Sequence, residues 1–221
     1  MLDTLPYRAF FQFEFPIRHV AKPPRMTGDI RAWPRACLAP PLVSIERHAD
    51  PVADVFFAWS DEGFHAAFDV HRSSPPRCDL VQWWKQDGLR LCIDTRDARD
   101  NKRATRFCHF FYLLPLGGGR DRRAPVVGLH RMSRAKEPPP EIDLTHINVR
   151  CRCDRRGYTL EATIPGACLH GWDPAEHPRI GIFYKVRDTV RGDQHLTVSD
   201  DLGWNVDPST WATGVLVRDS A

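Results

Sequence analysis

Two pairs of neighbouring side chains are of types that suit chemistry or ligand binding, namely Cys108 with His109 and Trp83 with Trp84. A thiol beside an imidazole can act as nucleophile and base. Neighbouring residues of an extended strand point to opposite faces, however, so we do not expect Cys108 and His109 to act together. The sequence also has no G-x-S-x-G, H-E-x-x-H, Walker or G-x-G-x-x-G motif. It therefore predicts a protein that is not an enzyme, with a catalytic site assembled from distant residues as an alternative.

Two tryptophans lie in long polar segments, Trp84 in 72–88 and Trp204 in 199–210. Burying an indole removes about 150–250 Å² from water and stabilises a protein by up to about 4–6 kcal/mol, which an exposed ring forgoes. Each ring either covers the rim of the fold or offers a flat plate to a hydroxyl-rich ligand, and the two together favour the plate. By the period of two of a strand, we expect Trp83 on the core side and Trp84 on the opposite side.

Oxygen-rich side chains gather in the segment 94–103, and oxygen ligands are those that Ca²⁺ prefers. These side chains belong to Asp94, Asp97, Asp100 and Asn101. Arginine and lysine residues are interleaved with them and can pair with the carboxylates. The sequence therefore favours an ion-pair loop over a metal site, and the same reasoning applies to Asp200 and Asp201. No metal ligand is assigned, and a structural calcium ion is kept as an alternative.

Composition and charge exclude several classes of partner. The seven cysteines lack C-x-x-C spacing, which predicts reduced thiols and neither a zinc knuckle nor a covalent haem. The formal net charge of +3 comes from 31 basic and 28 acidic residues, so we expect no nucleic-acid partner. No run approaches the ~18 apolar residues of a membrane span, and the N-terminus lacks the pattern of a secretory signal. We therefore expect a cytoplasmic protein without a membrane partner.

Apolar residues alternate with polar ones along most of the chain, as in half-buried strands. Two such stripes, at 55–59 and 64–70, flank the polar turn SDEG and predict a hairpin. Further stripes lie at 89–93, 107–113, 147–153, 158–164 and 180–186, with weaker strand candidates at 8–15, 125–131, 195–199 and 213–218. About ten strands with little helix predict an all-β sandwich or barrel. No shift in composition divides the chain, so we expect one domain, 1–221, in which 1–48 forms an N-terminal strand and a proline-rich wrap.

Five segments, taken in order, carry a resemblance to a known family. They are the hairpin DVFFAWSDEGFHAAFDV and then DGLRLCIDTRD, GYTLEATIPGACL, RIGIFYKVRD and DPSTWATGVLV. This order resembles family 9 carbohydrate-binding modules and the wider DOMON-like superfamily over residues 50–218, and it is similar to stand-alone bacterial members of that group. The resemblance implies a two-sheet antiparallel β-sandwich of jelly-roll type.

The resemblance also implies a site, because some members clamp the end of a sugar chain between two tryptophans while polar side chains reach its hydroxyls. Carried onto this chain, the candidate ligand-binding residues are Trp84, Trp204, Trp83, Asp87, Arg96 and Asn205. Structural calcium accompanies some members. Another branch of the superfamily binds haem without a covalent link, through methionine and histidine. Beyond the initiator this chain has only Met26 and Met132, so haem binding is the lesser alternative.

We therefore predict a non-catalytic carbohydrate-binding module without a cofactor, whose site is an aromatic platform of Trp84 and Trp204. Stacking of a base on an aromatic ring is worth ~1–3 kcal/mol. If a sugar ring stacks with comparable free energy, stacking on two rings is partly offset by the free-energy cost of association. The dissociation constant is then expected to be roughly micromolar to millimolar. The alternative is an interaction module that uses the same exposed indoles to bind a protein partner, since tryptophan is a common interface anchor.

Overall fold

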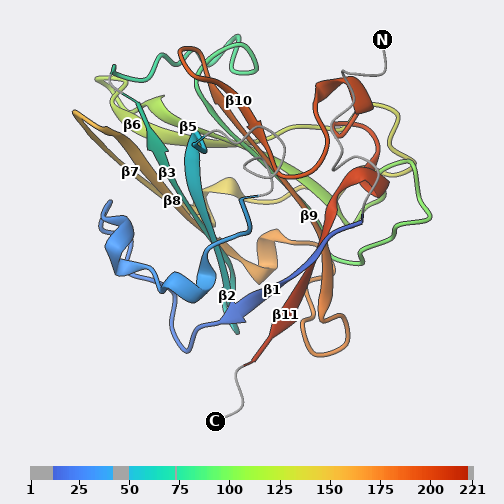
Figure 1. Cartoon of the computed structure of the whole chain (residues 1–221). Helices are drawn as coiled ribbons and strands as arrows, with labels where there is room; N and C mark the ends of the chain where they lie inside the picture. Colours follow the sequence, from blue (N-terminus) through green and yellow to red (C-terminus); the bar gives the residue numbers. More distant parts are fainter. Residues whose placement is uncertain (1–11, 42–49, 73, 219–221) are drawn as a thin grey trace.

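The computed structural model describes residues 12–41, 50–72 and 74–218, and every strand within them joins one hydrogen-bonded sheet (Figure 1). The strands are β1 (Glu14–His19), β2 (Ala53–Ser60), β3 (Gly63–His71), β4 (Gly88–Asp94), β5 (Cys108–Gly118), β6 (Ala124–Leu129), β7 (Asn148–Asp154), β8 (Gly157–Pro165), β9 (Arg179–Asp188), β10 (Gly192–His195) and β11 (Ala212–Val217). They follow the order β6-β5-β4-β9-β11-β1-β2-β3-β8-β7, while β10 pairs with the end of β9 that β11 leaves free. The all-β class predicted from the alternation is confirmed.

The sheet curls until it is nearly closed, because β6 and β7, at the two ends of the order, contact one another. The expected division into two separate sheets is not confirmed, because β1 bridges the two halves by pairing with both β11 and β2. Both of these pairings are parallel, so the expectation of an entirely antiparallel sheet is wrong at β1. A strand in this position satisfies the backbone groups that two facing edges would otherwise leave unpaired.

The hairpin of β2 and β3 shows how the alternation builds the interior. Trp59 lies opposite Phe64 and Phe57 opposite Ala66 in the antiparallel register. Residues of one stripe point to one face, so the curled sheet encloses a continuous apolar core. The largest fully buried side chains are Trp211, Tyr184, Phe57, Phe64, Phe68, Phe111, Phe183, Ile17, Leu89, Leu91, Ile93 and Leu113. The predicted hairpin is therefore confirmed.

The N-terminal part of the chain covers the other face of β2 and β3. Trp33 and Cys37 pack there against Phe56 in a small second apolar cluster. The indole Nε1 of Trp33 donates a hydrogen bond of 2.9 Å to Glu161 on β8. The strand candidate at 8–15 lies partly outside the described residues, and the strand found begins at Glu14. The candidate at 195–199 is displaced, because β10 ends at His195.

Helix among the described residues occurs only as three-residue 3-10 turns, in agreement with the expectation of little helix. These turns are η2 (Ile30–Ala32), η3 (Arg35–Cys37), η4 (Leu144–His146), η5 (Gly166–Cys168), η6 (Asp200–Leu202) and η7 (Pro208–Thr210). In the described part of the chain, no helix has the length and apolar character needed to cross a bilayer. The long connections between strands are therefore irregular, and two of them, β3–β4 and β10–β11, carry the candidate tryptophans.

Candidate functional site

The face of β4, β5 and β9 that points away from the interior of the curled sheet carries two rows of large side chains. Directly opposed residues of paired strands share a face, as do residues two apart on one strand. The first row consists of Tyr112, Arg90 and Lys185. The second row consists of Phe110, Cys92 and Phe183. These rows form the floor on which two long connections lie.

Each connection places a tryptophan against this floor. In the β3–β4 connection, Trp83 stacks on Tyr112 with ring centroids 4.4 Å apart and an interplanar angle of 11°. Trp84 meets the ring of Trp83 edge to face at 6.0 Å. In the β10–β11 connection, Trp204 stacks on Phe183 at 4.7 Å with an interplanar angle of 16°. The floor thus orients both connections through aromatic contacts that are stronger than burial alone provides.

A cavity of about 320 Å³ opens between the two connections. Its lining includes four of the six predicted residues, all from the two connections: Trp83, Trp84, Trp204 and Asn205. The two principal tryptophans differ sharply in exposure, since Trp84 is 52% exposed and Trp204 only 6%. The cavity therefore has one open aromatic plate and one largely buried aromatic wall, whereas the sequence predicted two open plates. Burial of Trp204 follows from its stack on the floor.

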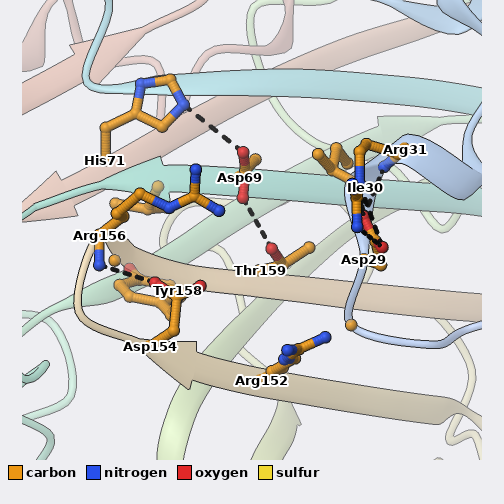
Figure 2. Close-up of a pocket in the computed structure, with 13 residues that line it drawn as sticks. Asp29, Ile30, Arg31, Asp69, His71, Arg152, Asp154, Arg156, Tyr158 and Thr159 are labelled. Carbon is orange, nitrogen blue, oxygen red and sulfur yellow. Dashed lines mark hydrogen bonds and ion pairs between the residues drawn. The ribbon is translucent and has the colours of Figure 1, made fainter.

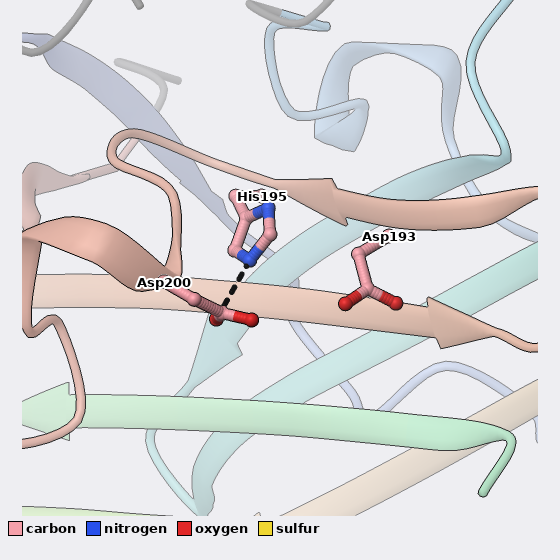
Figure 3. Close-up of side chains that lie close together, drawn as sticks. All are labelled: Asp193, His195 and Asp200. Carbon is pink, nitrogen blue, oxygen red and sulfur yellow. Dashed lines mark hydrogen bonds and ion pairs between the residues drawn. The ribbon is translucent and has the colours of Figure 1, made fainter. Parts of the chain in front are cut away.

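The wall of the cavity near Trp204 is held by a charged cluster (Figure 3). Lys185 Nζ lies 2.9 Å from Asp193 and 2.6 Å from Asp200. His195 Nε2 lies 3.1 Å from Asp200 Oδ1, and Figure 3 shows the ring directed at that carboxylate. The indole Nε1 of Trp204 donates to the same oxygen at 2.8 Å. Asp200 thereby ties the buried tryptophan to the sheet.

These contacts set the charge states of the cluster. The hydrogen bond from His195, followed by those from Lys185 and Trp204, holds the pKa of Asp200 far below its usual range. Burial lowers the pKa of His195 and also that of His130, which lines the cavity. At neutral pH, Asp200 is therefore ionised and both imidazoles are neutral.

Comparison with solved structures finds the same fold elsewhere. A family 9 carbohydrate-binding module from Caldicellulosiruptor kristjanssonii, in complex with cellotriose, superposes with a TM-score of 0.62 over 94% of this chain and 95% of that chain, at 12% identity. A family 9 module from the same organism, in complex with glucose, superposes with a TM-score of 0.62 over 93% of this chain and 97% of that chain, at 13% identity. The chain has the fold of family 9 carbohydrate-binding modules. No protein-family model and no curated protein sequence matches it.

Within this family 9 fold, two of the predicted polar residues lie away from the cavity. Asp87 is fully buried, and its carboxylate accepts hydrogen bonds from the backbone N–H groups of Arg77 and Thr189. Arg72 Nη1 lies 2.6 Å from it as an ion pair, without the direction of a hydrogen bond. A buried carboxylate that already has these partners holds the start of β4 in place and does not face a ligand.

Arg96 is also distant from the cavity lining, because it lies in the loop that follows β4. Its guanidinium stacks over the ring of Phe107 at 4.5 Å. Its Nη1 donates to the backbone carbonyls of Thr95 and Gly171. The loop is thus fastened to the segment after η5. The alternation of side chains between the two faces of a strand could not predict the position of Arg96, because this alternation ends with β4.

Trp83 is partly buried and packs against the core cluster, but it does so through the floor of the cavity, on the face of the sheet opposite to Leu89, Leu91 and Ile93. The residues around it form turns, and β4 begins only at Gly88, where φ is +153°. The period of a strand therefore does not extend back to Trp83, as the Asp-Gly pair at this point allows.

Sequence reasoning missed four lining residues on or next to the floor, namely Arg90, Phe110, His130 and Lys185. The first two and the last alternate with the inward stripes, so the period of two places them on the opposite face of the sheet and shows nothing of what covers that face. The signal that could have identified them is the amino-acid type at these outward-facing strand positions. A large apolar side chain at an outward position, such as Phe110, indicates that something covers that face of the sheet.

The only group of three potential metal ligands within the described residues is Asp193, His195 and Asp200. The ammonium of Lys185 already pairs with both carboxylates of this group. The Lys185 ammonium thus neutralises the two carboxylates that would otherwise attract a metal ion. In the loop 94–103, Asp94 accepts hydrogen bonds from the backbone N–H groups of Arg96 and Ala98. Both features favour ion pairs and hydrogen bonds over calcium.

A second cavity, of about 290 Å³, lies between the segment 28–31 and strands β3, β7 and β8 (Figure 2). Two carboxylates of this cavity pair with neighbouring side chains. Asp69 accepts a hydrogen bond of 2.7 Å from Thr159 and lies 3.5 Å from His71, as the dashed lines in Figure 2 show. Asp29 and Arg31 pair at 2.7 Å. Since no tryptophan lines this cavity, it lacks the broad plate on which a sugar ring stacks.

Proposed function

We propose that the protein is a non-catalytic module that binds carbohydrate in the cavity between Trp84 and Trp204. The observation that carries this proposal is that one cavity brings together tryptophans from two separate connections, β3–β4 and β10–β11. The fold supports it, because the superposed modules of the same fold were determined with cellotriose and with glucose. We assign the contact residues as Trp84, Trp204, Trp83 and Asn205.

Each part of the cavity has a role in this proposal. The half-exposed ring of Trp84 offers its face to the C–H side of a sugar ring. Asn205 supplies both donors and acceptors to hydroxyl groups, and the ionised Asp200 supplies acceptors. With one open plate and a cavity at the lower end of the usual volume range of ligand pockets, we expect a dissociation constant between about 1 µM and 1 mM.

The test is a titration of glucose and cellotriose, followed by tryptophan fluorescence and by calorimetry. Wild-type protein is expected to bind at least one of the two sugars, and Trp84→Ala to weaken that binding by roughly 5- to 150-fold, as a stacking energy of ~1–3 kcal/mol requires. Val81→Ala is the matched control, because Val81 is an exposed apolar residue of the same connection that does not line the cavity. Equal loss in the control and in Trp84→Ala would argue against the cavity as the site.

One observation favours a second candidate, an interaction module. Three large apolar residues that lie within five positions of one another in the β3–β4 connection are exposed: Leu80 by 49%, Val81 by 78% and Trp84 by 52%. Exposed apolar side chains that lie together mark interaction surfaces. The variant Val81→Asp separates the candidates, since it should abolish binding of a protein partner and leave the sugar response intact.

A further inference from the structure

The floor of the cavity contains a buried cation that has no carboxylate partner among the described residues. Arg90 is 2% exposed and lines the cavity. Its Nη2 donates to the backbone carbonyl of Trp83 at 2.7 Å, and its guanidinium lies 5.3 Å from the centre of the Trp83 ring. Its Nη1 is buried and has no hydrogen-bond acceptor in the part of the chain that the structure describes. Burial lowers the pKa of Arg90 to about 10, which leaves the group charged at neutral pH.

The neighbouring cations of the floor are compensated, in contrast to Arg90. Lys185, directly opposite Arg90 in the register, pairs with Asp193 and Asp200. Arg187 shares Asp193 at 2.9 Å. Three cations thus lie near two carboxylates. Burial lowers the pKa of both His195 and His130, so neither imidazole adds a positive charge at neutral pH. Counted over the described residues, the cluster has one excess positive charge, and Arg90 is its member without an ion pair.

A buried guanidinium with an unused donor is unfavourable unless an acceptor reaches it. The best acceptor is a carboxylate, because hydrogen bonds between two charged groups are about twice as strong as neutral ones and a guanidinium can hold a carboxylate with two N–H groups. A single excess charge also suits a carboxylate better than a phosphate, which carries about −1.5 to −2 at pH 7.

We propose that the preferred ligand of the cavity is a sugar that bears a carboxylate, such as a uronic acid, and that Arg90 binds that carboxylate while the sugar ring lies on Trp84. This inference rests on the proposed function, because it assigns a substrate class to the same cavity. It adds that charge, and not only ring stacking, selects the ligand. Binding should therefore weaken as salt concentration rises.

The experiment measures, by calorimetry at pH 7, the affinity of the protein for three probes with the same sugar ring. They are glucose, glucuronate and the uncharged glucuronamide. Wild-type protein is expected to bind glucuronate at least tenfold more tightly than the other two, with a smaller ratio at 0.3 M than at 0.02 M salt. Arg90→Gln should abolish this preference, and Arg90→Lys should retain part of it. Arg152→Gln is the control, since it removes an exposed arginine on β7 that lines only the second cavity.

The outcomes distinguish this inference from the proposed function. Equal affinity for glucose and glucuronate would overturn the carboxylate inference and leave carbohydrate binding standing. No affinity for any of the probes would overturn both. A preference that persists in folded Arg90→Gln would overturn the role of Arg90. If circular dichroism shows that Arg90→Gln does not fold, the wild-type preference and its salt dependence, together with Arg90→Lys, still decide the inference.

Discussion

Trp204 and Trp84 line the same cavity, yet their replacement by alanine should have different consequences for stability. Trp204 is 6% exposed, stacks on Phe183 at 4.7 Å and packs against Phe110 at 5.5 Å. Burying the roughly 150–250 Å² of an indole stabilises the folded protein by at most ~4–6 kcal/mol. Replacing a buried aromatic residue by alanine costs about 3–5 kcal/mol. Trp204→Ala also removes the donor to Asp200. We expect Trp204→Ala to lose about 3–5 kcal/mol of unfolding free energy.

Trp84→Ala provides the comparison, because half of that side chain is exposed in the folded protein. We expect it to change the free energy of unfolding by less than about 1 kcal/mol, as surface substitutions do. Urea unfolding of both variants and of the wild type, followed by circular dichroism, measures the two changes. Trp204→Phe retains an aromatic ring over Phe183 and should recover most of the loss. A Trp204→Ala protein within about 1 kcal/mol of wild type would refute the argument that packing on the floor holds this connection in place.

Two further predictions concern buried charged and titratable groups. Asp87→Ala should destabilise the protein by about 3–5 kcal/mol, because it removes one of the two carboxylates that pair with the buried Arg72. A loss of less than about 1 kcal/mol in urea unfolding would contradict this prediction. Burial lowers the pKa of His109 to about 4, so the unfolded chain takes up a proton first as the pH falls below about 6.5. Stability should therefore decrease by about 2 kcal/mol between pH 7 and pH 5 through His109 alone. His109→Gln should show a correspondingly smaller decrease in urea unfolding at the two pH values, and an unchanged decrease would show that another group is responsible.

The strands were predictable because their pattern is local. Residues that alternate with period two, such as those of the β2–β3 hairpin, need only the pleat of a strand to separate an apolar face from the other face. The same alternation identified β4, β5, β7, β8 and β9. The exposure of Trp84 was also predictable, because the polar connection around it has no apolar stripe to bury it.

The cavity was decided by tertiary structure. The sequence identified Trp84 and Trp204 as a pair, but their shared cavity depends on β4, β5 and β9 being neighbours in the sheet. Arg90 and Lys185 become adjacent only through that pairing. An alternating pattern specifies which side chains share a face of one strand and contains no information about which strand lies beside it. Pairing depends on contacts between distant segments, and so did the parallel placement of β1, the burial of Trp204 and the uncompensated charge of Arg90.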